Sequence, residues 1–213
     1  YARNWVELLA TQRQVNVGSY ASEDRAEPHR GGYEYNWARS GATTDTMLSA
    51  GQTTGLARQI HDGLVSHAVL AIGQNDFSPA TSAYAGVYYQ GNPLLGWSQA
   101  KIDAYADHVA GNIETALDTL TADKVDLVVS TIVDYGVAPI TAVLYPDPAR
   151  RERVSTVIAG INNRIREAAR AHGLPVADLS ALAHRFLGTN QAPNGAEVLG
   201  GEVITNTGGV DPH

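Results

Sequence analysis

Two short, largely apolar runs limit the folds open to this chain more than any other feature of its sequence. Residues 68–72 and 125–133 are each long enough for one buried strand. Further along the chain from each run, apolar residues recur at helical spacing, over residues 98–120 and 147–171. Strands that alternate with helices indicate a parallel sheet covered by helices on both faces. The sequence therefore predicts an α/β fold with three layers, α/β/α.

The other elements follow from periodicity, capping residues and turn residues. Helices are predicted at residues 4–10, 44–50, 53–62, 98–120, 147–171 and 179–187. Strands are predicted at residues 14–17, 67–72, 125–133 and 174–178, with a further short strand at 202–204. Loops are predicted at residues 18–34, 77–97 and 134–146. A chain of 213 residues can bury one sizeable core, so we predict a single domain over residues 1–213.

Composition excludes several classes of protein. The formal net charge of −7 disfavours a protein that wraps a nucleic acid. No apolar run approaches the roughly 20 residues of a membrane span. The absence of cysteine rules out disulfides, thiolate metal sites and a cysteine nucleophile. The histidines lie apart, without the spacing of metal ligands, so neither a metal nor another cofactor is predicted.

The chemistry of the chain is concentrated in two turns. Residues 36–44 lead through Gly41 into the predicted helix 44–50, and Gly73-Gln74-Asn75-Asp76 follows the predicted strand 67–72. In an open α/β sheet, ligands bind at the carboxyl ends of the strands. We therefore expect Asn75 to direct its side-chain amide into an active site. Asp76 is predicted to cap a helix or hold the turn rather than to act in catalysis.

Together the two turns resemble two sequence blocks of the SGNH (GDSL-type) hydrolases. In that family, a glycine in a turn that enters a helix donates its backbone N–H to an oxyanion. The asparagine of a Gly-x-Asn-Asp turn donates its side-chain N–H to the same oxygen. The resemblance assigns these roles to Gly41 and Asn75. It extends over nearly the whole chain and implies a flavodoxin-like, doubly wound parallel sheet.

The resemblance implies a serine ester hydrolase that acts through an acyl-enzyme. Its substrate class would be a small-molecule, lipid or carbohydrate ester, and the enzyme would be an esterase, a lipase or a carbohydrate acetylesterase. The residue types suit this chemistry, because preorganised donors stabilise the negative charge that develops on the carbonyl oxygen. Gly73, Tyr84 and Tyr88 are predicted to contact the substrate. An alternative for the aromatic loop 77–97 is a surface loop packed by its own tyrosines.

The chain also departs from the family. It contains no Gly-Asp-Ser, the block that holds the nucleophile at the end of the first strand, and Asp211-Pro212-His213 does not have the Asp-x-x-His spacing of the base. We expect a fragment that lacks the first strand, with the serine before Tyr1 and the Asp-His pair beyond His213. A lost signal peptide would make a secreted or periplasmic location plausible, and the oligomeric state is left open. The alternative function is a non-catalytic ligand-binding or scaffold domain that retains the two turns.

Overall fold

A parallel sheet forms the centre of the structure, which is a computed structural model that describes residues 5–23, 31–193 and 195–205. The sheet contains β3 (His67–Leu70), β4 (Asp126–Ser130) and β5 (Val176–Ala177), in the order β3-β4-β5. Both neighbouring pairs are parallel, with Leu70 opposite Val129 and Val129 opposite Val176. The α/β fold with a parallel sheet is thus confirmed. The three-layer arrangement and a missing first strand stay predictions.

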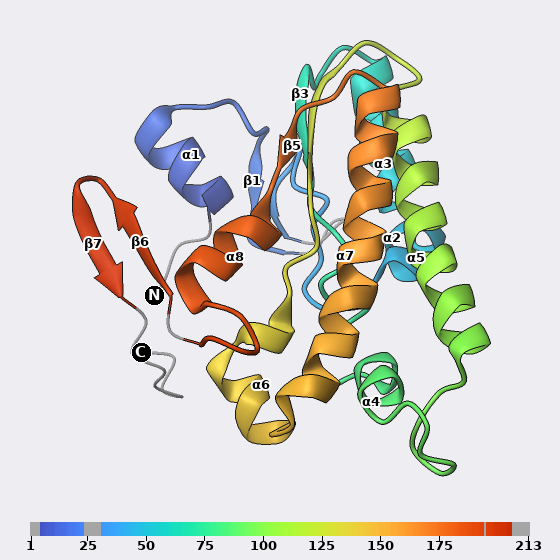
Figure 1. Cartoon of the computed structure of the whole chain (residues 1–213). Coiled ribbons are helices and arrows are strands. Elements are labelled where there is room, and N and C mark those ends of the chain that lie inside the picture. Colours follow the sequence, from blue (N-terminus) through green and yellow to red (C-terminus); the bar gives the residue numbers. More distant parts are fainter. Residues whose placement is uncertain (1–4, 24–30, 194, 206–213) are drawn as a thin grey trace.

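Helices follow the strands in the predicted order. The helical segments are α1 (Trp5–Arg13), α2 (Thr44–Ser49), α3 (Gln52–His61), α4 (Ser82–Tyr88), α5 (Gln99–Leu120), the 3-10 turn η1 (Tyr135–Val137), α6 (Pro139–Leu144), α7 (Pro148–Ala171) and α8 (Leu179–Leu187). Two antiparallel pairs flank this arrangement, β1 (Tyr20–Ala21) with β2 (Gly32–Tyr33) and β6 (Ala196–Leu199) with β7 (Glu202–Thr205). Figure 1 shows α3, α5 and α7 side by side against the sheet, with α1 and α8 toward its other side.

The two long helices supply most of the core. The apolar stripes predicted for them are buried against the sheet, and their fully buried members include Val109, Ile113, Leu117, Ile158 and Ile161. Each helix begins where the sequence supplies a cap. Ser98 accepts a hydrogen bond from the N–H of Lys101, and Asp147 accepts from the N–H groups of residues 149 and 150. No helix among the described residues is long and apolar enough to cross a membrane.

The structure corrects four of the predicted elements. Residues 14–17 form no strand and are irregular, because their polar–apolar alternation has no neighbouring strand to pair with in the described residues. The predicted loop 77–97 contains α4, whose first turn is capped by the side chain of Thr81. The predicted loop 134–146 contains η1 and α6. The predicted loop 18–34 contains the paired short strands β1 and β2. The strand at 202–204 is confirmed as β7, and its partner β6 was not predicted.

Candidate active site

The two turns that the sequence singled out lie against each other. The side-chain Nδ2 of Asn75 donates to the backbone oxygen of Ala42 over 2.9 Å. The carboxylate of Asp76 accepts from the backbone N–H of Thr44 over 3.0 Å and from its hydroxyl over 2.8 Å. The strand-exit turn therefore holds the first residue of α2 by two hydrogen bonds and the turn before it by a third. This places Asn75 beside the backbone that directly follows Gly41.

Both glycines of these turns have a positive φ, but the consequences differ. Gly41 has φ +80° and is exposed, and a Cβ added to it would meet no atom within 4 Å. Gly73 has φ +100°, and a Cβ there would lie 2.5 Å from Cδ1 of Ile132. Gly41 thus leaves open space in front of its backbone, whereas Gly73 lets the strand exit pack closely on Ile132, two residues after β4.

The Asn75 amide keeps one donor available. An amide nitrogen carries two N–H groups, and the bond to Ala42 uses one of them. Asn75 is only partly buried, so part of its surface is open to solvent. An amide also donates at any pH at which the protein is folded, since it does not titrate. The arrangement can therefore stabilise an oxygen that develops negative charge.

Asp76 holds the turn, as predicted. It is 2% exposed, and burial raises the pKa of its carboxyl while the two hydrogen bonds from Thr44 lower it. Each carboxylate oxygen of Asp76 thus accepts one hydrogen bond from Thr44, the first residue of α2. A carboxylate with these partners positions a helix end, and its contacts do not point to acid–base chemistry.

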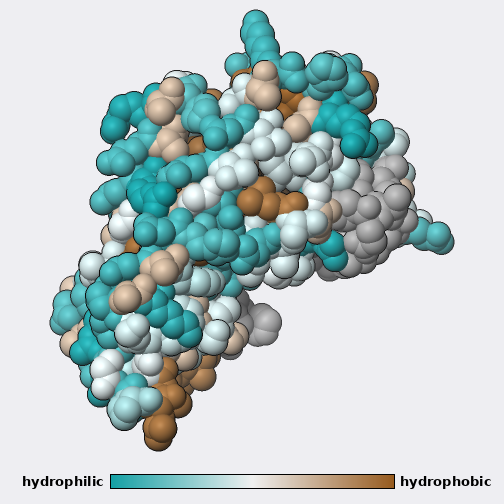
Figure 2. Space-filling view, turned by 90° about the vertical axis from the view of Figure 1, so that its right-hand side faces the viewer, coloured by the Kyte–Doolittle hydropathy of each residue, from teal (hydrophilic) through white to brown (hydrophobic). Residues whose placement is uncertain are grey.

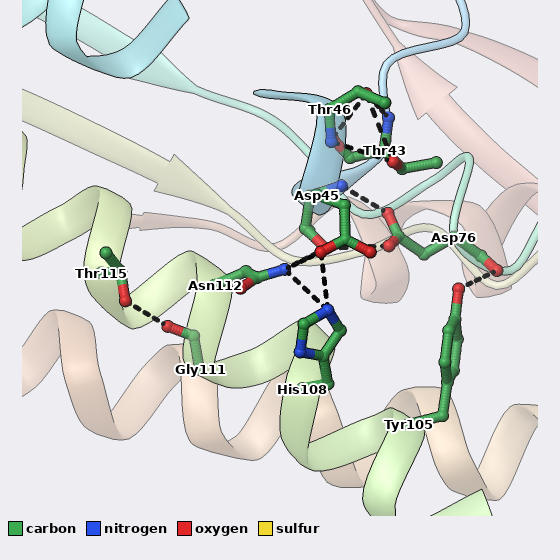
Figure 3. A network of polar contacts seen from close by, with 10 residues as sticks. Thr43, Asp45, Thr46, Asp76, Tyr105, His108, Gly111, Asn112 and Thr115 are labelled. Carbon is green, nitrogen blue, oxygen red and sulfur yellow. Dashed lines mark hydrogen bonds and ion pairs between the residues drawn. The ribbon is translucent and has the colours of Figure 1, made fainter. Parts of the chain in front are cut away.

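Helix α5 supports the same turn from behind (Figure 3). The hydroxyl of Tyr105 donates to the backbone oxygen of Asp76 over 3.2 Å. Asn112 donates to the Thr44 hydroxyl over 3.2 Å and to a carboxylate oxygen of Asp45 over 3.0 Å. Burial raises the pKa of Tyr105 to about 12, so its hydroxyl remains a donor. Sequence reasoning placed these residues on a core helix and missed their contacts with the turn.

The structure buries Tyr84 and Tyr88, whose contact with a substrate stays a prediction. Both rings pack on Tyr145, with centroid separations of 4.7 and 4.8 Å. Tyr84 is fully buried, and the hydroxyl of Tyr88 accepts the backbone N–H of Asp147 over 3.0 Å. The loop's tyrosines therefore form part of the core, which is closer to the alternative of a segment packed by its own aromatic residues. Gly73 remains beside Asn75, but it too is buried.

A buried aspartate and a half-exposed histidine form a pair that the sequence did not reveal. Asp134 is 2% exposed and lies beyond the carboxyl end of β4, where it accepts the N–H of Gly136 over 2.8 Å. Its other carboxylate oxygen lies 3.2 Å from Nε2 of His184, which belongs to α8. The hydrogen bond with Asp134 raises the pKa of His184. The two residues are 50 positions apart, so only the fold could bring them together.

This pair gives a pH-dependent prediction. Since the pKa of His184 is higher in the folded chain than its ordinary 6.5, the pair stabilises the fold fully below pH 6.5. That stabilisation is lost as the pH rises through the folded pKa. His184→Gln should therefore lower the free energy of unfolding more at pH 5.5 than at pH 8.5, by up to about 1 kcal/mol. Urea unfolding at both pH values measures this, and in an Asp134→Asn background the difference should disappear.

One chain of Ser, His and Asp contacts does occur among the described residues, but in the wrong place. The Ser66 hydroxyl lies 2.9 Å from Nδ1 of His67, whose Nε2 lies 3.4 Å from Asp126. The side chains of His67 and Asp126 are 78% and 79% exposed, and such contacts are weak in water. The group also lies at the amino ends of β3 and β4, opposite the edge that carries Asn75. It is therefore a surface contact and not a candidate triad.

A parallel α/β sheet whose carboxyl edge joins an asparagine turn to a helix-entering glycine turn is typical of one class of α/β ester hydrolases. The sequence profile of the GDSL-like lipase/acylhydrolase family matches residues 8–198, and the chain belongs to this family. The resemblance noted from the two turns is thus confirmed. No curated protein matches the sequence.

The solved structures support the fold. An extracellular lipase from Streptomyces rimosus matches with a TM-score of 0.50 and 17% sequence identity, over 84% of this chain and 82% of that one. Asp211 and His213, whose spacing differs from that of the family's Asp-x-x-His block, lie outside the described residues.

Proposed function

We propose that this chain carries the oxyanion hole of a serine ester hydrolase, with donors from the backbone N–H of Gly41 and the side-chain N–H of Asn75. The observation that carries the proposal is the hydrogen bond between Asn75 and Ala42, which holds the amide next to the Gly41 turn. The open space in front of Gly41 supports it, because a substrate carbonyl can approach there. Membership in an acylhydrolase family supports the same chemistry.

The proposed reaction proceeds in two halves. A serine oxygen attacks the ester carbonyl carbon, a histidine takes the hydroxyl proton, and the two amide donors stabilise the oxyanion of the tetrahedral intermediate. Collapse of that intermediate expels the alcohol, which receives the proton, and leaves an acyl-enzyme. Water then attacks the acyl carbon by the same route and releases the acid. The substrate class is a small-molecule, lipid or carbohydrate ester, and the two halves need no cofactor.

We further propose that the nucleophile and its base lie outside these 213 residues. The outer edge of β3 supports this, because β4 is its only partner strand among the described residues and Val69 is half exposed there. An additional parallel strand on that edge would end next to the Gly73 turn. A Gly-Asp-Ser block at the end of such a strand would bring its serine close to Asn75.

An ester assay tests this proposal. The 213-residue chain should not hydrolyse p-nitrophenyl acetate above the buffer rate, whereas a form extended by a strand that ends in Gly-Asp-Ser and by an Asp-x-x-His segment should. Serine→Ala in the added block should abolish that turnover. Turnover by the 213-residue chain that depends on one of its own serines would place the nucleophile elsewhere. An extended form that binds esters without cleaving them would favour the alternative, a non-catalytic binding module.

A further inference from the structure

Two segments at one end of the molecule carry no charged residue. Residues 77–100 and 135–146 contain no Asp, Glu, Lys, Arg or His, although the chain as a whole has a formal net charge of −7. The first segment forms α4 and the loop after it, and the second forms η1 and α6. Figure 1 places both at the lower end of the molecule. The two uncharged segments, far apart in the sequence, therefore lie at the same end of the fold.

The two segments pack on each other through tyrosines. The ring of Tyr145, which follows α6, contacts the rings of Tyr84 and Tyr88 in α4. The Tyr145 hydroxyl also donates to the backbone oxygen of Pro79 over 2.9 Å. These contacts fix α6 relative to α4, so the side chains that both segments expose have a defined arrangement.

What the two segments expose is aliphatic. Five large aliphatic side chains project from them: Leu94 (91% exposed), Leu95 (57%), Ile140 (51%), Val143 (62%) and Leu144 (58%). Figure 2 shows apolar surface projecting at the lower end, where Figure 1 has these segments. Single exposed leucines are common on proteins, but five within two uncharged segments are not scattered.

The loop that carries the leucines is held in shape. The side-chain oxygen of Asn92 accepts the backbone N–H groups of Leu94 and Leu95, over 2.9 and 3.0 Å. The N–H of Gly96 donates to the backbone oxygen of Asn92, and the N–H of Trp97 donates to that of Gly86 in α4. The backbone therefore directs both leucine side chains outward, away from the core that could otherwise bury them.

Aromatic and basic side chains lie at the base of these projections. The ammonium group of Lys101 lies 4.0 Å from the centroid of the Trp97 ring. The guanidinium of Arg150 lies within 6 Å of the centroids of Tyr88 and Tyr89. Aromatic rings with a cation beside them, below an aliphatic tip, match the order of groups found where proteins enter the headgroup region of a bilayer.

We propose that this end of the molecule, formed by the loop 90–97 and by α6, is a binding surface for a phospholipid membrane. The leucines and α6 would enter the acyl region, and Trp97 with Lys101 would lie at the headgroup level. The shape favours a membrane over a protein, since two convex aliphatic projections fit a deformable surface without a matching groove. The two segments themselves carry no charge, so their aliphatic side chains can enter a zwitterionic membrane, and the basic groups of Lys101 and Arg150 behind them can contact the lipid phosphates. This inference does not depend on ester hydrolysis.

Vesicle binding tests the proposal without an enzyme assay. The 213-residue chain should co-sediment with phosphatidylcholine vesicles, and Leu94→Asp with Leu95→Asp should lower the partition coefficient about 10-fold or more. Val143→Asp should lower it as well. Leu64→Asp is the matched control, because Leu64 is equally an exposed leucine (51%) outside the two segments. Urea unfolding of each variant verifies that the fold is retained.

Two results would overturn the proposal. One is that the 213-residue chain does not bind phosphatidylcholine vesicles, or that the Leu94 and Leu95 replacements lower binding no more than the Leu64 control does. The other is self-association in the absence of lipid, seen by analytical ultracentrifugation and abolished by the Leu94 and Leu95 replacements. That second result would assign the surface to a copy of the same chain.

Discussion

Replacing Asn75 by alanine is expected to lower kcat for ester hydrolysis about 10²-fold, in a form of the protein that carries the proposed serine. The amide is held next to the Gly41 turn by one of its N–H groups, and we propose that the other donates to the oxyanion. Because the oxyanion exists in the transition state and hardly in the bound ester, KM should change little. Initial rates over a range of p-nitrophenyl acetate concentrations separate the two constants.

The neighbouring residue supplies a control for this experiment. Gln74 lies in the same turn and has no predicted contact with the oxyanion, so Gln74→Ala should leave kcat within about twofold. Asn75→Ala also removes the bond to Ala42, which should cost about 1 kcal/mol of stability, a loss that leaves the protein folded at 25 °C. An Asn75→Ala enzyme with unchanged kcat would remove this residue from the oxyanion hole.

Local patterns identified those parts of the fold that depend on local physics. The apolar run 125–133 predicts β4 because a central strand of a parallel sheet is buried on both faces. The stripes on residues 98–120 and 147–171 predict α5 and α7 because their buried residues recur at helical spacing. The turn Gly73-Gln74-Asn75-Asp76 indicated a ligand site from local sequence too, because a turn that directly follows a parallel strand lies at the carboxyl edge of the sheet.

The features that the sequence did not reveal depend on contacts between distant residues. Helix α4 has a weak pattern of its own, and Tyr84 and Tyr88 belong to it because Tyr145, some 60 residues away, packs on them. Residues 14–17 alternate like a strand, but alternation without a partner strand forms no sheet. Asp134 and His184 meet only in the folded chain. The exposure of Leu94 could not be predicted either, because its neighbours in sequence are equally apolar.

A buried asparagine on the apolar stripe of α7 gives the largest stability prediction. Asn162 is 1% exposed, and its Oδ1 accepts the backbone N–H of Ile132 over 2.7 Å while its Nδ2 donates to the backbone oxygen of Ile132 over 3.0 Å. Asn162→Leu keeps a similar volume but leaves both backbone groups of a fully buried residue without partners. An unpaired buried polar group costs about 1–3 kcal/mol, so the free energy of unfolding should fall by about 3–4 kcal/mol.

The adjacent residue allows a matched comparison for this loss. Asn163 is exposed on the same helix, and Asn163→Leu should change the free energy of unfolding by no more than about 0.5 kcal/mol in the same urea titration. A loss below 1 kcal/mol for Asn162→Leu would show that Ile132 finds other partners. The same substitution should also affect the candidate site.

Ile132 is the residue against which Gly73 packs, so releasing the backbone of Ile132 frees the turn that positions Asn75. In an enzyme that carries the proposed serine, Asn162→Leu should therefore lower kcat even under conditions in which the variant is fully folded, whereas Asn163→Leu should not.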